Sequence, residues 1–493
     1  MVDKDLLSIQ EARSLVRAAR TAQAILAEMN QEQVDDLTLA ISIAAAKEAE
    51  SLGKLAHEET GYGKTADKKA KNILASEQLY KCIKPMKTIG IVSEDTDRKI
   101  IEIATPAGVI AGIIPSTNPT ATAIYKSMIS IKAGNAVVFT PHPSATKCIK
   151  KAVDIMRAAL KAKGAPEDLI NVMSIPSIGG TNELMRQADL ILATGGPGMV
   201  KAAYSSGTPA LGVGAGNVPA FIERSADIES ALDKILLSKT FDNGTVCASE
   251  QAIVTENVIA DKVKERLIAK GGHFLEGDDL LKVRSVMERA GGSMNPAVVG
   301  RDAAYIASLA GISIPAGTKV LVCEEAGIGP KHHFSKEKLT ALLGFFRVET
   351  WQDACETCDK LLKNGGLGHS LAIHSNNDAI VREFAMKKPV SRLLVNTPST
   401  HGAVGLSTNL FPSFTLGCGP VGGSATSDNV TPDNLYSIRR VAYETTAMPM
   451  QATCETTAAP MEASQATTAA PAAGSVDIKL VTEMILKQLK GLN

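Results

Sequence analysis

The sequence predicts an α/β protein in which two α/β domains share a cleft. From residue 89 onwards, short apolar runs broken by Gly and Pro alternate with amphipathic segments, as in chains that repeat a strand and a helix. The runs have the character of buried strands, which is typical of a largely parallel sheet covered on both faces. The chain has 493 residues, 45% of them hydrophobic, which suffices for two to four domains with sizeable cores.

The charge balance excludes several classes of protein. The chain carries 52 Lys and Arg against 52 Asp and Glu, with 4% aromatic residues, so it has neither the basic surface nor the stacking platforms of a nucleic-acid-binding protein. The N-terminus lacks a secretory signal, and no run of eighteen apolar residues predicts a membrane span. We therefore expect a soluble intracellular protein without nucleic-acid or membrane partners, whose eight cysteines are reduced thiols.

The elements follow in order along the chain. Residues 1–88 are rich in Ala, Glu and Lys with apolar residues at helical spacing, which predicts two or three helices packed on the next domain. Residues 89–224 are expected to form the first α/β domain, with a helix over 144–163 and strands over 101–104, 109–114, 136–139, 190–194 and 220–223. Residues 225–410 are expected to form the second, with helices over 228–240 and 351–363, a strand over 251–255, and further stretches at 319–323, 338–350 and 371–374.

The last fifty residues differ in composition from the rest. Residues 445–475 hold 10 Ala and 7 Thr among 31 residues, which predicts a flexible linker without a core. Residues 476–493 place one apolar stripe opposite a charged face, as in an amphipathic helix. A helix of this length needs a partner, either its own protein or another one, and we favour a docking peptide for another protein over a membrane surface.

Cys247 is the strongest catalytic candidate in the sequence. It lies between a predicted helix and a predicted strand, after a Gly that permits a tight turn, and loops at the edge of a sheet commonly present reactive side chains. The alternative is a small buried hydrophobic residue.

Several segments resemble one enzyme family. Residues 242–251 around Cys247 resemble the nucleophile loop of the aldehyde dehydrogenase superfamily, in the form found in its coenzyme A-acylating branch. Residues 104–119, 394–402 and 415–423 agree with it, and the resemblance covers about residues 5 to 445 in order. It implies a Rossmann-like NAD-binding domain over 89–224 and a catalytic domain over 225–410. It further implies that residues 411–444 return to the cofactor domain and include an oligomerisation segment, as in homodimers or homotetramers.

The resemblance implies a thioester mechanism. The Cys247 thiolate would add to an aldehyde, and the oxyanion would be stabilised by the backbone N–H of Cys247 and the side-chain amide of Asn118. Pro115 and Pro119 flank Asn118 and would stiffen its loop. Without the resemblance, a turn-forming Asn would be the simpler interpretation.

The resemblance also implies where NAD binds. Thr194, Gly195 and Gly196 follow a predicted strand and open the next helix, where free N–H groups could meet a pyrophosphate. Glu337 matches the residue that holds the nicotinamide ribose. A glycine turn that only packs, and an exposed solvated Glu, are the respective alternatives.

The segment that binds the adenosine ribose departs from the family pattern. Many members carry a Lys after the strand that corresponds to residues 136–139, whereas this chain has Thr140, His142 and Ser144 and no Lys. Either ribose recognition differs, or this part of the pocket also serves the adenosine of coenzyme A.

An absent residue bears on the acyl acceptor. Hydrolytic members carry a Glu that activates water, and its position falls here on Gly212, or on Val213 if the register slips by one. Neither residue is a base, so a thiol nucleophile such as coenzyme A is the expected acceptor. No metal is expected, because the spaced pair Cys355 and Cys358 lies in a predicted helix without a second pair.

Together these points predict an NAD-dependent, coenzyme A-acylating aldehyde dehydrogenase. The tail over 476–493 resembles the encapsulation peptides that bind shell proteins of bacterial microcompartments. The expected setting is therefore the bacterial cytoplasm, in a microcompartment lumen, and the expected substrate is propionaldehyde or else acetaldehyde. Two alternatives remain, a hydrolytic aldehyde dehydrogenase and a non-catalytic scaffold.

Overall fold

Five parallel strands form the first sheet of the protein. The computed structural model describes residues 3–289 and 294–446, and within them this sheet has the order β5-β4-β3-β6-β7. Its strands are β3 (Val109–Ile114), β4 (Ala136–Pro141), β5 (Ile170–Val172), β6 (Leu190–Thr194) and β7 (Ala210–Val213). They alternate with α6 (Pro119–Lys132), α7 (Thr146–Ala162), α8 (Ile178–Gln187) and α9 (Pro197–Tyr204). The order reverses direction between β3 and β6, which is where ligands bind in open α/β sheets.

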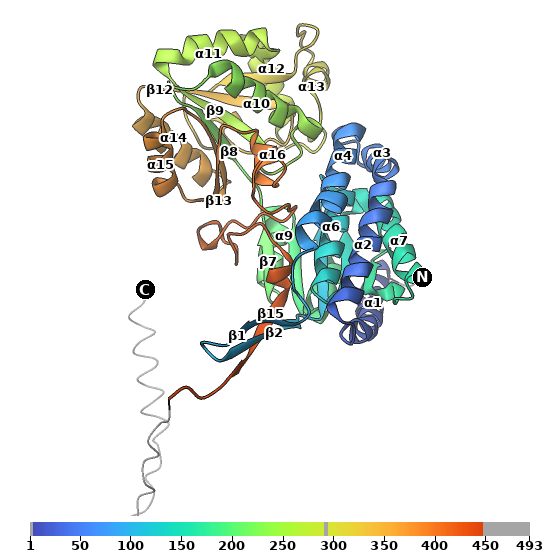
Figure 1. Cartoon of the computed structure of the whole chain (residues 1–493). Helices are drawn as coiled ribbons and strands as arrows, with labels where there is room; N and C mark the ends of the chain where they lie inside the picture. The colour runs from blue at the N-terminus through green and yellow to red at the C-terminus, as the bar shows by residue number, and fades with distance from the viewer. Residues whose placement is uncertain (1–2, 290–293, 447–493) are drawn as a thin grey trace, which may run out of the picture. The chain divides into compact units, whose positions relative to one another are not determined.

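The N-terminal helices pack on this sheet, and the apolar faces of all but the fourth share its core (Figure 1). They are α1 (Lys4–Leu26), α2 (Gln31–Lys47), α3 (Ala49–Thr60), α4 (Thr65–Ile73) and α5 (Leu79–Ile83), with a π-helical turn at Leu74–Gln78. The expectation of two or three helices was wrong, because local caps divide the segment further. Asn30 forms a capping box with Gln33 at the start of α2, and Gly61, with a φ of 69°, ends α3.

Seven parallel strands form the second sheet, in the order β10-β11-β12-β9-β8-β13-β14. They are β8 (Val218–Ile222), β9 (Glu250–Glu256), β10 (Gly272–Phe274), β11 (Val320–Glu324), β12 (Leu342–Val348), β13 (Gly368–His374) and β14 (Val390–Val395). On one face lie α10 (Ile228–Thr240) and α11 (Asn257–Ala269), and on the other α14 (Trp351–Lys363) and α15 (Asp378–Lys387) (Figure 1). Further along, α12 (Gly277–Met287) and α13 (Ala303–Ala310) pack beside β11, and α16 (Ser399–Ala403) packs near β14. The predicted parallel α/β architecture is confirmed.

One strand lies in a different sheet from the one we expected. The apolar run 220–223 was assigned to the first domain, which we ended at residue 224, but β8 pairs with β9 and β13 in the second sheet. The crossing between the two sheets therefore falls between β7 and β8. An apolar run shows that a strand is buried, but it carries no information about which sheet the strand joins.

A small antiparallel sheet was also missed. It consists of β1 (Gly90–Asp95), β2 (Ile100–Pro106) and β15 (Tyr436–Ala442) (Figure 1). The strand expected over 101–104 is present as β2, but it pairs antiparallel with β1 and β15 and does not join the parallel sheet. These strands expose much of their surface, unlike the buried strands of the parallel sheets. The segment before β15 does return to the first domain, where Val430 and Leu435 join its core.

Contacts divide the chain into residues 1–443 and residues 444–493. The predicted helix over 476–493 lies outside the described residues, as does the predicted linker over 445–475 apart from its first two residues. Within the described ranges, the structure contains no helix with the length and apolar character needed to cross a membrane.

Candidate active site

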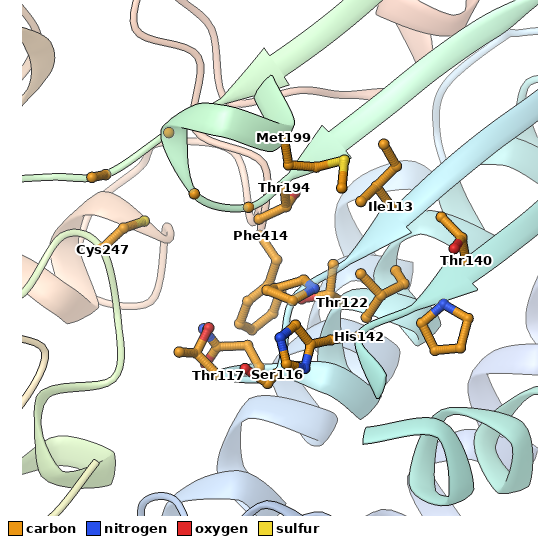
Figure 2. A pocket seen from close by; sticks show the side chains of 18 of the residues that line it. Ile113, Ser116, Thr117, Thr122, Thr140, His142, Thr194, Met199, Cys247 and Phe414 are labelled. Atoms are coloured by element: carbon orange, nitrogen blue, oxygen red, sulfur yellow. The ribbon is translucent and has the colours of Figure 1, made fainter. Parts of the chain in front are cut away.

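A cavity of about 540 Å³ lies at the carboxyl ends of β3, β4 and β6, between the two sheets. It brings together most of the residues that the sequence singled out, and those that line it are Asn118, Thr140, His142, Thr194, Gly195, Gly196, Cys247 and Glu337. Figure 2 shows Cys247 on one side of this cavity and Thr140 on the opposite side, with Thr194 and Phe414 between them. Ser144 is not among the lining residues.

Cys247 occupies a tight turn between a 3₁₀ turn (Phe241–Gly244) and β9. The 3₁₀ turn has left-handed backbone at Asp242, Asn243 and Gly244, with φ values of 49°, 52° and 76°. Figure 2 shows the Cys247 side chain pointing into the cavity. Burial, reinforced by the charge of Glu337, raises the pKa of the Cys247 thiol to about 12, so the thiol is protonated at neutral pH in the free protein.

Asn118 immediately precedes α6, whose first residue is Pro119. Its side-chain Nδ2 donates to the carbonyl oxygen of Thr245 at 3.0 Å, and its Oδ1 accepts from Lys71 Nζ at 2.6 Å. The donor end of the amide therefore faces the loop that carries Cys247. Donation to an oxyanion on a Cys247 adduct would replace the longer of the two contacts of Nδ2, the one to Thr117 Oγ1 at 3.3 Å.

The Thr194 turn ends β6 and leads into α9. The Thr194 hydroxyl is buried and has no hydrogen-bond partner among the described residues. A buried hydroxyl without a partner costs free energy unless a ligand or water satisfies it. Pro197 is the first residue of α9 and lacks an N–H, so this helix start offers fewer backbone donors to a pyrophosphate than a start without Pro would.

Glu337 is half-buried at the cavity wall, where its Oε1 accepts the backbone N–H of Gly216 at 2.9 Å. Burial raises the pKa of its carboxyl group to about 7, against the opposing effects of the Gly216 N–H and of Lys239 and Lys338. The alternative of an exposed, solvated Glu is therefore wrong.

The remaining candidates lie at the far side of the cavity. Thr140 Oγ1 is 2.8 Å from Thr181 Oγ1, so the two buried hydroxyls are bonded to each other. His142 Nδ1 accepts the backbone N–H of Ser144 and is 2.8 Å from the Ser144 hydroxyl. Since Ser144 does not line the cavity, its direct contact in the structure is with His142, and the expected ligand contact is not shown.

Several lining residues were not predicted. Ile178, whose side chain is 80% exposed, and its neighbours Pro176 and Ser177 follow β5 at the start of α8. Phe414 and Leu416 lie on the segment that follows α16. The first group could have been found from its place after a strand, because the carboxyl ends of parallel strands meet at one edge. Phe414 carries no such local signal.

The two positions at which the resemblance would place a hydrolytic Glu are Gly212 and Val213, and the surroundings of Gly212 are filled. A β-carbon on Gly212 would lie 2.9 Å from the Tyr204 ring and 3.0 Å from Val200. The Tyr204 hydroxyl accepts the Gly212 N–H at 2.9 Å and lies 3.1 Å from the Gly212 carbonyl oxygen. Val213 is buried in β7 and does not line the cavity. Neither position can supply a base to the cavity.

The two spaced cysteines pack in a core. Cys355 and Cys358 lie on α14 and are buried against the second sheet. No group of three or more His, Cys, Asp or Glu side chains that could hold a metal ion occurs in the parts of the chain that the structure describes.

Known sequences resemble this chain over most of its length. The model of the aldehyde dehydrogenase family matches residues 6–286. The bifunctional aldehyde-alcohol dehydrogenase AdhE of Escherichia coli (strain K12) is 46% identical over 442 residues, which are 88% of this chain and 50% of that protein. The chain thus spans about half the length of that relative. An acetylating succinate-semialdehyde dehydrogenase of Clostridium kluyveri is 38% identical over 87% of this chain and 95% of its own length.

Solved structures agree with these relatives. An acetylating aldehyde dehydrogenase from Geobacillus thermoglucosidasius matches with a TM-score of 0.90 and 46% identity, covering 92% of this chain and all of that one. A propionaldehyde dehydrogenase from the fucose utilisation microcompartment of Clostridium phytofermentans matches with a TM-score of 0.79 and 29% identity, covering 88% and 97%. The family model, the curated relatives and the solved structures point to the same family. The chain therefore belongs to the aldehyde dehydrogenase family.

Proposed function

We propose that this protein oxidises an aldehyde to an acyl-coenzyme A with NAD, through a thioester on Cys247. The observation that carries the proposal is the cavity itself. Cys247, Asn118 and the Thr194 turn line it together, whereas Gly212 stands where a hydrolytic enzyme needs a carboxylate. The solved structures that resemble the chain include a Rhodopseudomonas palustris propionaldehyde dehydrogenase with bound propionyl-CoA, which supports the same chemistry here.

The first half-reaction makes the thioester. Cys247 Sγ adds to the aldehyde carbon, and its proton passes to Glu337, the carboxylate that the described lining residues include. Asn118 Nδ2 and the backbone N–H of Cys247 stabilise the oxyanion. The unpartnered Thr194 hydroxyl and the Glu337 carboxylate fit a dinucleotide, so Thr194, Gly195, Gly196 and Glu337 would hold NAD. Bound NAD supplies the hydride acceptor.

The second half-reaction transfers the acyl group. The coenzyme A thiol loses its proton to solvent and attacks the thioester carbon. Cys247 leaves and takes back the proton that Glu337 holds, which restores the thiol and the carboxylate, and the same two donors stabilise the second oxyanion. Without a carboxylate at Gly212, water is the poorer competitor for the acyl enzyme. The sum is aldehyde, coenzyme A and NAD⁺ giving acyl-CoA, NADH and a proton.

NADH formation with and without coenzyme A tests this proposal. We expect multiple turnovers only when coenzyme A is supplied, and none in Cys247→Ala. The matched control is Cys82→Ala, which removes an exposed cysteine and should leave the rate unchanged. Equal steady-state rates without coenzyme A would instead favour the hydrolytic alternative, and an active Cys247→Ala would refute the thioester mechanism.

We further propose a short aliphatic substrate, propionaldehyde before acetaldehyde. A second cavity of about 20 Å³ adjoins the main one through Val246, Val404 and Phe414, and its other walls include Leu74, Phe241 and His401. That space holds about one water molecule, so it suits a short alkyl group. Initial rates with two-, three- and four-carbon aldehydes test this, and the fastest turnover with butyraldehyde or longer chains would refute it.

We propose that residues 476–493 bind a shell protein and direct a homodimer or homotetramer into a microcompartment lumen. The amphipathic pattern of that segment supports this, as does the microcompartment source of one similar structure. Deletion of residues 446–493 should preserve activity and oligomer size in ultracentrifugation but abolish co-purification with shells. Loss of the oligomer on this deletion would show that the segment folds back on its own protein.

A further inference from the structure

A buried ionic cluster lies directly behind Asn118. It consists of Lys68 and Lys71 on α4 and Asp242 in the Cys247 loop, whose side chains are 3%, 3% and 0% exposed. Lys68 Nζ is 3.0 Å from Asp242 Oδ2, and Lys71 Nζ is bonded to the same oxygen. No step of the proposed reaction uses these three side chains, although burying three charges is costly unless they are closely paired.

The cluster is joined to the oxyanion donor in a closed ring of hydrogen bonds. Asp242 Oδ2 accepts the Thr245 hydroxyl at 2.8 Å, and the Thr245 carbonyl accepts Asn118 Nδ2 at 3.0 Å. Asn118 Oδ1 then accepts Lys71 Nζ at 2.6 Å, and Lys71 returns to Asp242. The ring connects α4, the start of α6 and the Cys247 loop, three segments that are far apart in the sequence.

The ring determines which end of the Asn118 amide faces the nucleophile loop. The two ends of an Asn side chain have nearly the same shape, but one donates and the other accepts. A protonated Lys71 can only donate, so it selects the oxygen, and the Thr245 carbonyl can only accept, so it selects the nitrogen. A reversed amide would present an oxygen to the developing oxyanion and would destabilise it.

We propose that Lys71, held by Asp242, is a positioning residue that sets the orientation of the Asn118 amide for oxyanion stabilisation. This inference rests on the proposed function, because it assigns Lys71 a role in that reaction. Lys71 acts through Asn118, and Asp242 acts through Lys71 and Thr245.

Burial lowers the pKa of Lys71 to about 8 against the opposing charge of Asp242, so Lys71 is mostly protonated at neutral pH, as this role requires. Burial works to raise the pKa of Asp242, but the charges of Lys71 and Lys68 outweigh it and hold that pKa well below its usual range. The Asp242 seat is closely fitted, since a β-carbon on Gly63 would lie 1.7 Å from Asp242 Oδ1. Lys68 also donates to the Thr117 carbonyl at 3.2 Å, which fixes the residue before Asn118.

A double-mutant cycle tests the proposal. Asn118→Ala should lower kcat by about 10² to 10³-fold, the usual effect of losing an oxyanion donor. Lys71→Met should lower kcat by about 10- to 100-fold and change the KM for aldehyde by less than about threefold, because it removes an interaction that matters in the transition state. In the Asn118→Ala background, Lys71→Met should cost less than about threefold more. The matched control is Lys69→Met, which removes an exposed lysine of the same helix that pairs with Glu50.

A second measurement separates positioning from general damage to the loop. Alkylation of Cys247 by iodoacetamide forms no oxyanion on a carbonyl, so Lys71→Met should change its rate at pH 7, where Lys71 is protonated, by less than about threefold. Additive effects in the cycle, or alkylation that falls in parallel with turnover, would overturn the inference. If Lys71→Met does not fold, Lys71→Met with Asp242→Asn removes the opposite charges together and is subject to the same criteria. A wild-type protein without coenzyme A-dependent activity would refute the proposed function and this inference with it, whereas an additive cycle in an active enzyme refutes the inference alone.

Discussion

The free enzyme should react slowly with iodoacetamide at Cys247. The perturbation is alkylation of the protein without cofactor or substrate, at a series of pH values. Burial and the charge of Glu337 raise the pKa of the Cys247 thiol to about 12, whereas an unhindered thiol has a pKa of about 8.5. Because the thiolate is the reacting form, the rate at neutral pH depends on the small ionised fraction.

The expected magnitude follows from these two pKa values. The difference of about 3.5 pH units makes the Cys247 thiolate about 3,000-fold scarcer than that of a free thiol at pH 7. The more basic thiolate is intrinsically more nucleophilic, by roughly 25- to 55-fold for a Brønsted coefficient of 0.4–0.5. The net alkylation rate should therefore be about hundredfold slower than that of the free thiol. It should still rise about tenfold per pH unit at pH 9, where a free thiol has already levelled off.

Peptide mass spectrometry measures this rate for Cys247 separately from the other cysteines. A small thiol in the same buffer gives the reference rate, and Cys247→Ala confirms the assignment of the labelled peptide. Exposed Cys82 reports on the reagent in the same sample. Alkylation of Cys247 at the rate of the free thiol at pH 7, or a plateau below about pH 9, would refute the reasoning.

Three further substitutions probe the site and its supports. Gly216→Ala should lower turnover at least tenfold, and destabilise the fold by about 1–3 kcal/mol in urea titration, because its β-carbon would lie 2.0 Å from the Cys247 carbonyl oxygen; wild-type activity would contradict this. Burial raises the pKa of the Glu250 carboxyl group from 4.5 to about 7. Between these two pH values the unfolded chain has released a proton that the folded chain still holds. The free energy of unfolding therefore falls as the pH rises from 4.5 to about 7. This group contributes at most about 1.4 kcal/mol per pH unit, which Glu250→Gln should abolish in urea titrations at pH 5 and 7. Tyr204→Phe leaves the Gly212 N–H without its partner and should cost about 1–3 kcal/mol in the same assay, and an unchanged unfolding midpoint would show that this bond is dispensable.

The sequence predicted elements best where local signals mark their ends. The helix expected over 228–240 and the helix expected over 351–363 have those limits in the structure, and each begins after a capping residue, Asp227 or Thr350. The sequence did not predict which sheet β8 joins, nor the small antiparallel sheet, because pairing between strands is decided by tertiary packing. An apolar run of a given length therefore predicts a buried strand, but it does not predict which of the two parallel sheets that strand joins.

The candidate site shows the same division. Residues at the ends of strands, such as Thr194, could be placed near the cavity because parallel strands align their carboxyl ends. Lys71 and Phe414 could not, since they reach the site from segments far away in the sequence and have no motif of their own. A lysine in a polar helix gives no local sign that its side chain is buried and bonded to Asn118.

The two connections between the parallel sheets are themselves part of the cavity wall. The chain leaves the first sheet through Gly214 and Ala215 and comes back through the segment that contains Phe414 and Leu416, and all four residues line the cavity. A rotation of one sheet against the other would bend these two connections, so a ligand that contacts them would resist it. Occupancy and hinge stiffness are then coupled by linkage, so a ligand that fills the cavity should slow amide hydrogen exchange in both connections. The stretches of chain that join the two sheets therefore also form part of the binding surface.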